Sequence, residues 1–255
     1  MRSSDRFGGR GTTAGSRVQV SSTAETKTGA VVATQQQAGG SSEHQLFPHH
    51  VTDIDVGGAF QQGIKIGVIG YGYWGPNLVR NFMEAPGSTV VVVCDLRHER
   101  LAQLRVRYPT VHTVSEAGVL FNDPSLDAIV IATPVSSHFE LAMAALRAEK
   151  HVLVEKPLAA NAEQSIQLIE EAARRQRVLM VDHTFVYTAA VRKIRELIIA
   201  NALGDIYYYD AVRVNLGLFQ HDVNVIWDLA IHDLSIMDYV LPEKATAVSA
   251  TGISH

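Results

Sequence analysis

The stretch Ile64–Gly75 reads IKIGVIGYGYWG. An aliphatic run is followed at once by Gly70, Gly72 and Gly75, which have the G-x-G-x-x-G spacing. The run is typical of a strand buried on both faces of a parallel sheet, and the glycines allow a tight turn into the helix expected from Pro76. A glycine turn without a ligand is the alternative, but strand, glycines and helix in this order are the context that a dinucleotide-binding turn requires. We therefore expect a pyrophosphate to bind at the start of that helix.

An acidic residue stands where this kind of turn requires one. Asp95 lies 20 residues after Gly75 and directly follows the next apolar run, Thr89–Cys94. A carboxylate there accepts hydrogen bonds from ribose hydroxyls and repels a 2′-phosphate, which favours NAD over NADP. Arg97 weakens that preference, because an arginine can accommodate the phosphate.

Short apolar runs alternate with helical segments along the following 120 residues. The predicted strands are Ile64–Ile69, Thr89–Cys94, Val111–Val114, Asp127–Thr133, His151–Glu155 and Val178–Val181. The predicted helices are Pro76–Glu84, Glu99–Arg107, Phe139–Ala148 and a helix that Asn161 caps, with Gln164 completing a capping box, and that runs to Gln176. This alternation predicts an α/β fold, a Rossmann-type doubly wound parallel sheet.

The pattern changes after residue 182. Helices are expected at Val191–Ala200 and Trp227–Val240, and strands at Ile206–Val214 and Ala245–Ile253. We interpret residues 61–182 as a NAD-binding domain and residues 183–255 as a partial α+β substrate and dimerisation domain. Two strands make a poor sheet, so this second domain looks cut short.

The first 60 residues differ in composition from the rest. Of these residues, 28 are Gly, Ser, Thr or Gln, and only three are aromatic. Such a segment buries too little apolar surface to offset its ordering entropy, so a disordered leader is expected over residues 1–60. It lacks the apolar core of a secretory signal, and its acidic residues argue against a transit peptide.

Composition excludes several classes of protein. The 255 residues carry a formal net charge of −4, which argues against a sequence-independent nucleic-acid binder. Cys94 is the single cysteine, so no intrachain disulfide can form, and a reducing, cytoplasmic location is expected. No apolar run approaches the roughly 18 residues that a membrane helix needs.

Polar or turn-forming residues directly follow the predicted strands. In an open parallel sheet these positions line the crevice where ligands bind. They are Gly70, Asp95, Thr133–Pro134, Glu155–Lys156–Pro157 and His183. Each could instead do no more than end its strand.

Three side chains are candidates for catalysis. At the edge of a buried sheet, the Lys156 ammonium can hold a hydroxyl and stabilise charge on its oxygen, although a structural ion pair with Glu155 or a neighbour is the alternative. Asp228 and His232 lie four residues apart on one helix face, and a histidine can accept a proton from an alcohol. A structural histidine is the more common case on sequence grounds alone.

A metal site is not expected. The acidic and histidine residues of this region are His221, Asp222, Asp228, His232 and Asp233, and their spacing fits no zinc pattern. Arg192, Lys193 and Arg195 could meet a diphosphate, but a solvated helix face is the more common explanation for such residues.

Taken together, these motifs resemble the glucose–fructose oxidoreductase, inositol dehydrogenase and rhizopine-catabolism family, Gfo/Idh/MocA. The resemblance covers residues 64–255. It rests on Gly70–Gly75, Asp95, Ala132–Thr133–Pro134 with His138, Glu155–Lys156–Pro157 and Asp228-x-x-x-His232.

The resemblance implies a role for each motif. Lys156 and His232 serve catalysis, with Asp228 as the third member. The residues implied in cofactor binding are Gly70, Gly72, Tyr73, Trp74, Gly75, Asp95, Arg97, Thr133, Pro134, His138, Glu155 and Lys156. Family members continue beyond the histidine helix with strands that cover the site, so the chain looks truncated, and a homo-oligomer is expected if that domain is complete.

Within the family, Arg213–Gly217 through Trp227–Leu229 resembles the nucleotide-sugar branch, which implies oxidation of the 3-hydroxyl of a UDP-N-acetylglucosamine-type substrate with NAD. The alternatives are an inositol or other polyol dehydrogenase of the same family, and a non-catalytic dinucleotide-binding regulator or fragment. We expect a small-molecule partner and neither a nucleic acid nor a membrane.

Overall fold

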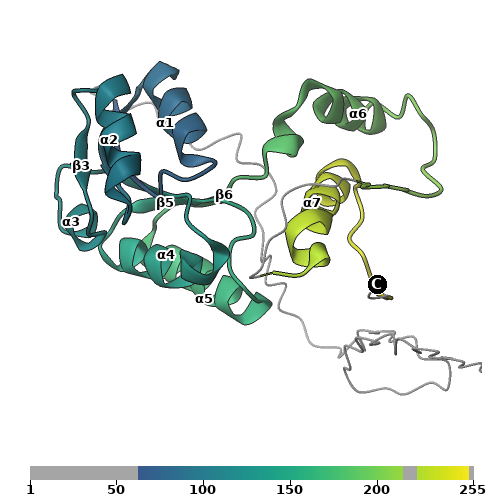
Figure 1. Cartoon of the computed structure of the whole chain (residues 1–255). Coiled ribbons are helices and arrows are strands. Elements are labelled where there is room, and N and C mark those ends of the chain that lie inside the picture. The colour runs from purple at the N-terminus through teal and green to yellow at the C-terminus, as the bar shows by residue number, and fades with distance from the viewer. Residues whose placement is uncertain (1–62, 215–222, 253–255) are drawn as a thin grey trace, which may run out of the picture. The chain divides into compact units, whose positions relative to one another are not determined.

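The computed structural model describes residues 63–214 and 223–252 (Figure 1). The expected leader, two of the weighed metal ligands (His221 and Asp222) and Asn215–Gly217 therefore lie outside the described residues. The chain divides into two units. One spans His50–Pro242, and of the other the structure describes only residues 243–252, which form no helix or strand.

Six parallel strands form one sheet in the order β3-β2-β1-β4-β5-β6. Their bounds are β1 Ile64–Ile69, β2 Ser88–Cys94, β3 His112–Val114, β4 Ala128–Ile131, β5 His151–Val154 and β6 Leu179–Val181. This order and the all-parallel pairing are those of the doubly wound dinucleotide-binding fold, which confirms the predicted fold class.

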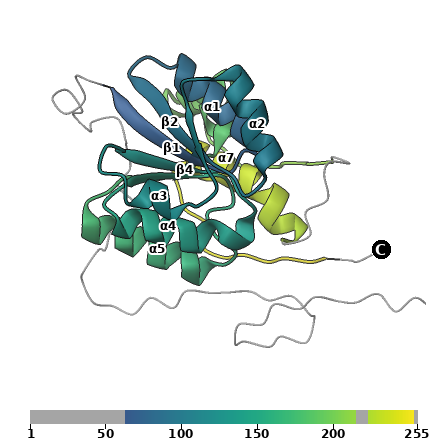
Figure 2. The same cartoon turned by 60° about the vertical axis from the view of Figure 1, so that its left-hand side comes forward.

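Helices cover both faces of this sheet. Between the strands lie α1 Gly75–Glu84, α2 His98–Arg107, α3 Gly118–Phe121, the 3₁₀ turn η1 Val135–Ser137, α4 His138–Arg147 and α5 Ala162–Arg175. Helices α1 and α2 lie on one face, and α4 and α5 on the other (Figures 1 and 2). Successive strand residues point to opposite faces, so the buried Val68 packs under α1 and α2 while its neighbour Ile69 packs on the other side.

The crevice of the fold lies between β1 and β4. From β1 the chain moves to β2 on one side, and it later returns to β4 on the other, so the strand order reverses at this point. The connections after these two strands run to opposite faces, which leaves a crevice at their carboxyl ends. Gly70 and Thr133 stand on either side of it.

A helical segment follows β6. It contains the 3₁₀ turn η2 Thr184–Tyr187, α6 Ala189–Ile199, the π turn η3 Ile226–Ala230 and α7 Ile231–Val240. Helices α6 and α7 contact each other. The Arg195 guanidinium donates to the carbonyl of Tyr239 at 2.8 Å and lies 4.2 Å from the centre of its ring, which fixes the two helices together.

Two predicted strands are wrong. Residues 206–214 and residues 245–252 are described without strand structure. A strand is stable only when its backbone groups are paired, and the described residues offer neither segment a partner. The three consecutive tyrosines Tyr207–Tyr209, which break the alternation, are exposed to different extents.

The remaining elements agree with the predictions to within a few residues, except that the short α3, η1 and η2 were not expected. Asn161 caps α5 by accepting a hydrogen bond from the backbone of Gln164 at 2.9 Å. The Gln164 side chain accepts from the backbone N–H of Ala160 rather than from that of Asn161.

No helix within residues 63–214 and 223–252 is long and apolar enough to cross a membrane. Over the same residues, no group of three or more His, Cys, Asp and Glu side chains is placed so that it could hold a metal ion.

Candidate active site

The glycine turn leaves no room for side chains at two of its positions. Gly70 has φ +98°, and a Cβ built there would lie 2.5 Å from the carbonyl oxygen of Ala132. A Cβ on Gly75 would collide with the carbonyl oxygen of Gly70, so this glycine lets α1 approach β1 closely. Trp74, at the N-cap of α1, forms no side-chain hydrogen bond to the helix. Pro76 has no N–H, and the N–H of Asn77 donates to the carbonyl of Trp74 at 2.9 Å, so the N–H of Gly75 is the donor that the start of α1 offers to an anion.

Asp95 is tied to this turn. Its carboxylate accepts hydrogen bonds from the backbone N–H of Tyr71 at 2.7 Å and of Arg97 at 2.8 Å. The Arg97 side chain lies 3.4 Å from the same carboxylate and is half exposed. Burial raises the pKa of Asp95, but these hydrogen bonds and the guanidinium charge lower it more, so the net pKa lies below its ordinary value. The carboxylate is therefore ionised, and it holds Arg97 beside the crevice.

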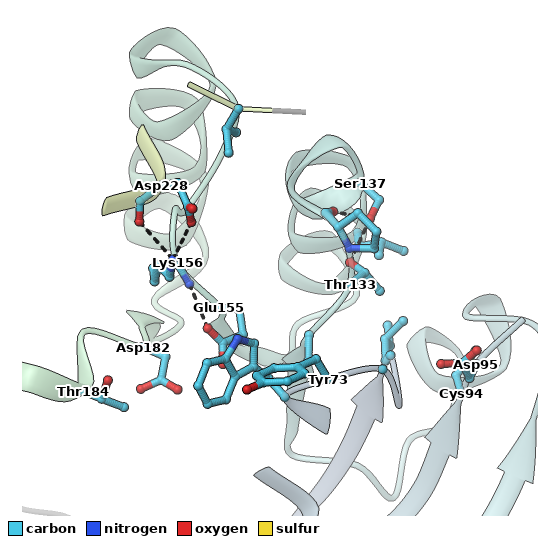
Figure 3. Close-up of a pocket in the computed structure, with 18 of the residues that line it drawn as sticks. Tyr73, Cys94, Asp95, Thr133, Ser137, Glu155, Lys156, Asp182, Thr184 and Asp228 are labelled. Carbon is cyan, nitrogen blue, oxygen red and sulfur yellow. Dashed lines mark hydrogen bonds and ion pairs between the residues drawn. The ribbon is translucent and has the colours of Figure 1, made fainter. Parts of the chain in front are cut away.

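A cavity of about 1370 Å³ opens over the strand ends (Figure 3). It contains most of the predicted site residues. Those that line it are Gly70, Gly72, Tyr73, Trp74, Asp95, Arg97, Thr133, Pro134, Glu155, Lys156, Asp228 and His232. The structure thus brings residues from the glycine turn, three strand ends and the segment after β6 into one site.

Two predicted cofactor-binding residues, Gly75 and His138, are not among the side chains that line the cavity. The His138 ring is buried, with Nδ1 2.8 Å from the carbonyl oxygen of Pro157 and Nε2 2.8 Å from that of Thr133. It thereby links the end of β4 to the loop that follows β5. This geometry supports a positioning role.

Lys156 forms an ion pair with Asp228, which lies 72 residues further along the chain. The Lys156 ammonium donates to the Asp228 carboxylate at 2.8 Å and to the Asp228 carbonyl at 3.0 Å (Figure 3). Both side chains are largely buried, with exposed fractions of 15% and 17%. The ion pair therefore holds the Lys156 side chain in place at the cavity. The sequence-based alternative was a structural ion pair with Glu155 or a neighbour. The ion pair forms with Asp228, and only the backbone N–H of Lys156 contacts the Glu155 carboxylate, at 3.3 Å.

The π turn η3 positions Asp228. Trp227 donates its indole N–H to the carbonyl of Ala159 at 2.7 Å, which ties the turn to the loop after β5. Asn224 accepts from the backbone N–H of Trp227 at 3.0 Å and, through its carbonyl, from that of Asp228. Because π turns bond i to i+5, the geometry here differs from the simple i, i+4 face expected from sequence.

His232 is buried at the side of the cavity. Its ring meets that of Phe185 edge to face, with centres 4.8 Å apart, and its Nδ1 has no hydrogen-bond partner in the described part of the chain. Burial, together with the positive charges of Lys156 and Arg213, lowers the pKa of His232 to about 4. The imidazole is therefore neutral near pH 7 and can accept a proton.

A carboxyl pair lies beside Lys156 at the ends of β5 and β6. Burial, followed by the charge of Asp182, raises the pKa of Glu155 to about 7. Burial likewise raises the pKa of Asp182. The sequence predicts that His183 is the residue at the end of β6 that faces the crevice. In the structure, Asp182 lines the cavity instead.

Other lining residues were also missed. Ser137 donates its hydroxyl to that of Thr133 at 2.7 Å, and Phe185 supports His232. Arg213 donates two 2.8 Å hydrogen bonds to Asp233, the neighbour of His232. The one sequence signal that could have found any of them is the strand-end rule, which applies to Asp182; the others depend on tertiary contacts.

The basic residues of α6 do not line the cavity. Arg192 lies over the ring of Tyr187, Lys193 pairs with Glu196, and Arg195 bonds to α7. These contacts favour the structural interpretation of this basic group.

Comparison with known proteins supports the dinucleotide-binding fold. Residues 64–183 match the family described as an oxidoreductase family with an NAD-binding Rossmann fold, GFO_IDH_MocA. This part of the chain is thus similar to the Gfo/Idh/MocA family. The match covers the whole sheet and ends at His183, so the segment that carries Asp228 and His232 lies beyond it.

Curated relatives include proteins with different names. The "Uncharacterized oxidoreductase YdgJ" of Escherichia coli is 36% identical over 149 residues, 58% of this chain and 42% of that protein. The "Myo-inositol 2-dehydrogenase" of Thermotoga maritima is 25% identical over 74% of this chain and 58% of that protein. The "UDP-N-acetylglucosamine 3-dehydrogenase" of Acidithiobacillus ferrooxidans is 31% identical over 75% of this chain and 58% of that protein. The chain thus spans about half the length of the curated relatives that it matches.

Solved structures support the fold. A probable dehydrogenase from Thermotoga maritima superposes with a TM-score of 0.62 at 24% identity, and the match covers 71% of this chain and 56% of that one. At this identity the likeness shows the fold alone.

The residues present fit a nicotinamide dinucleotide. The turn at Gly70 and Gly72 brings backbone close to the cavity, and the start of α1, at Gly75, points the positive end of the helix dipole toward the phosphates. Asp95 would bind the adenosine ribose. Thr133, Glu155 and Lys156 line the cavity on the other side of the crevice, where the second nucleotide would lie.

Proposed function

We propose that the chain is the cofactor-binding and catalytic part of an NAD(P)-dependent dehydrogenase that oxidises a hydroxyl of a sugar or polyol. The observation that carries this proposal is the convergence of Lys156, Asp228 and His232 beside a dinucleotide crevice. Residues 61–182 would bind the cofactor, and residues 183–255 would form part of a substrate domain. A bound nicotinamide would supply the hydride acceptor.

The side chains divide the remaining chemistry. The Lys156 ammonium would hold the substrate hydroxyl and stabilise the negative charge that develops on its oxygen. His232, neutral near pH 7, would take the hydroxyl proton. Asp228 would keep the ammonium in place through their ion pair. The ionised Asp95 favours NAD, whereas the half-exposed Arg97 beside it would tolerate the 2′-phosphate of NADP.

The proposed substrate is a UDP-N-acetylglucosamine-type nucleotide sugar oxidised at its 3-hydroxyl. The 31% identity to the UDP-N-acetylglucosamine 3-dehydrogenase supports it. Inositol is the second candidate, because several matched relatives are named as inositol dehydrogenases.

A panel of substrates tests this proposal. Single-turnover formation of reduced cofactor would be followed with UDP-N-acetylglucosamine and myo-inositol, each with NAD and NADP. We expect one substrate to reduce one cofactor, and we expect Lys156→Met to remove that signal. Cofactor binding without reduction by any member of the panel would instead favour a non-catalytic dinucleotide-binding protein.

A further inference from the structure

Glu155 and Asp182 stand side by side at the carboxyl ends of adjacent strands. Val154 of β5 pairs with Val181 of β6, so the next residue of each strand falls at the same level and on the same face. The backbone N–H of Asp182 donates to the carbonyl of Val154 at 2.9 Å, which continues the ladder to this point. Both side chains line the cavity (Figure 3).

The two carboxyl groups face the same cavity from neighbouring strands, and burial raises the pKa of both. An ionised carboxylate only accepts hydrogen bonds, so two neighbouring carboxyl groups can bond to each other only when one of them holds a proton. Glu155 is 8% exposed, and two neighbouring negative charges at such a depth are unfavourable. The pair therefore carries a charge near −1 rather than −2 when the cavity holds no ligand.

The neighbouring charged groups do not neutralise the Glu155–Asp182 pair, so the pair still requires the proton. The Lys156 ammonium is the nearest cation in the loop, but its hydrogen bonds go to Asp228. The other titratable or charged groups of this part of the site are His183, Arg213, Asp228, His232 and Asp233. Of these, Arg213 pairs with Asp233, and His232 is neutral near pH 7.

We propose that Glu155 and Asp182 share a single proton in the ligand-free cavity and release it to solvent when an oxidised, positively charged nicotinamide binds. This inference rests on the proposed function, because that function places the nicotinamide half of the cofactor on this side of the crevice. The positive ring favours two ionised carboxylates, whereas the neutral reduced ring does not. No electron moves in this step, and the proton passes to the buffer. Through this pair, the affinity for the oxidised cofactor depends on pH, whereas the affinity for the reduced cofactor does not.

The test is the ratio of dissociation constants for NADH and NAD⁺ as a function of pH, measured by calorimetry on the full chain. If NAD⁺ lowers the pKa of the pair by about one pH unit, its affinity rises about tenfold between about pH 5.5 and about pH 8, whereas that of NADH stays nearly level. Calorimetry in buffers with different ionisation enthalpies would then show about half a proton released per NAD⁺ near pH 6.5. Groups at the adenosine end, such as Asp95, act on both cofactors alike and cancel in the ratio.

Two variants and one control make the test specific. Glu155→Gln and Asp182→Asn should each make the ratio independent of pH, while Glu163→Gln, at an exposed site on α5, should keep the wild-type curve. Thermal unfolding would show that each variant folds. Equal pH dependence for NAD⁺ and NADH, or a wild-type curve in both cavity variants, would overturn the proposal.

A ligand-free measurement separates this inference from the proposed function. Infrared difference spectra of the wild-type protein should show a carboxyl C=O band that titrates near pH 7 and is missing in Glu155→Gln. Absence of that band would overturn the shared proton even if dinucleotides bind. If the band is present but no dinucleotide binds, the proposed function fails, and with it the coupling to the nicotinamide.

Discussion

Replacing His232 with glutamine should change how the stability of the protein depends on pH. The imidazole has a reference pKa of 6.5, and burial beside Lys156 lowers it to about 4 in the folded chain. Between these values the unfolded chain binds more protons than the folded one, so the wild-type protein loses stability as pH falls from about 6.5 to about 4. At 1.36 kcal/mol per pH unit, the loss that His232 causes is about 3 kcal/mol. A glutamine side chain cannot be protonated in this range, so the His232→Gln variant escapes this loss.

The assay is urea unfolding of both proteins at several pH values, with the difference between their free energies of unfolding plotted against pH. Taking the difference between the two proteins cancels the pH-dependent contributions of the ionisable groups that both proteins share. We expect it to be constant above about pH 6.5 and then to shift by about 3 kcal/mol in favour of the variant, which corresponds to about 6–12 °C in melting temperature. His112→Gln serves as the comparison, because His112 is exposed on β3. A flat difference for His232→Gln, or the same curve for both variants, would refute the reasoning.

Three further substitutions test other parts of the site. Gly70→Ala should lower the free energy of unfolding by about 2–4 kcal/mol in a urea titration, because φ is +98° and the new Cβ would lie 2.5 Å from the Ala132 carbonyl; an unchanged midpoint would contradict this. Asp95→Asn should weaken two loop hydrogen bonds, at a cost of about 1–2 kcal/mol in the free energy of unfolding. In calorimetry it should also raise the affinity for NADP relative to that for NAD. An equal fall in the affinities for both cofactors would argue against a role of Asp95 in cofactor selection. Lys156→Met should leave NAD affinity within about threefold and reduce single-turnover rates at least about a hundredfold; parallel loss of binding would make Lys156 a cofactor anchor.

Local sequence patterns predicted the sheet because each strand there is short, apolar and buried between two helical layers. The aliphatic run before Gly70 and the β-branched run before Asp95 pair with each other in the sheet, so the local pattern and the tertiary context agree. The same reasoning failed at residues 206–214 and 245–252, where a strand depends on partners. Apolar content alone does not show whether a partner exists.

The site was predictable in part for the same reason. Strand-end positions placed Asp95, Thr133 and Glu155 at the crevice, because parallel strands end on one side. The ion pair of Lys156 with Asp228 joins segments that are 72 residues apart and depends on a π turn, so no spacing rule predicts it. Asp182 was missed because a shift of one residue at a strand end changes which side chain faces the ligand.

Transfer of deuterium tests the central claim most directly. The chain would be incubated with NAD⁺ and either UDP-N-acetylglucosamine deuterated at carbon 3 or myo-inositol deuterated at carbon 2, and the recovered cofactor would be examined by mass spectrometry. The account predicts reduced cofactor one mass unit heavier with one of these substrates, and no such product from Lys156→Met. Cofactor that stays oxidised with both substrates, although calorimetry shows that it binds, would contradict the claim that Lys156 and His232 serve hydride transfer from a hydroxyl-bearing carbon.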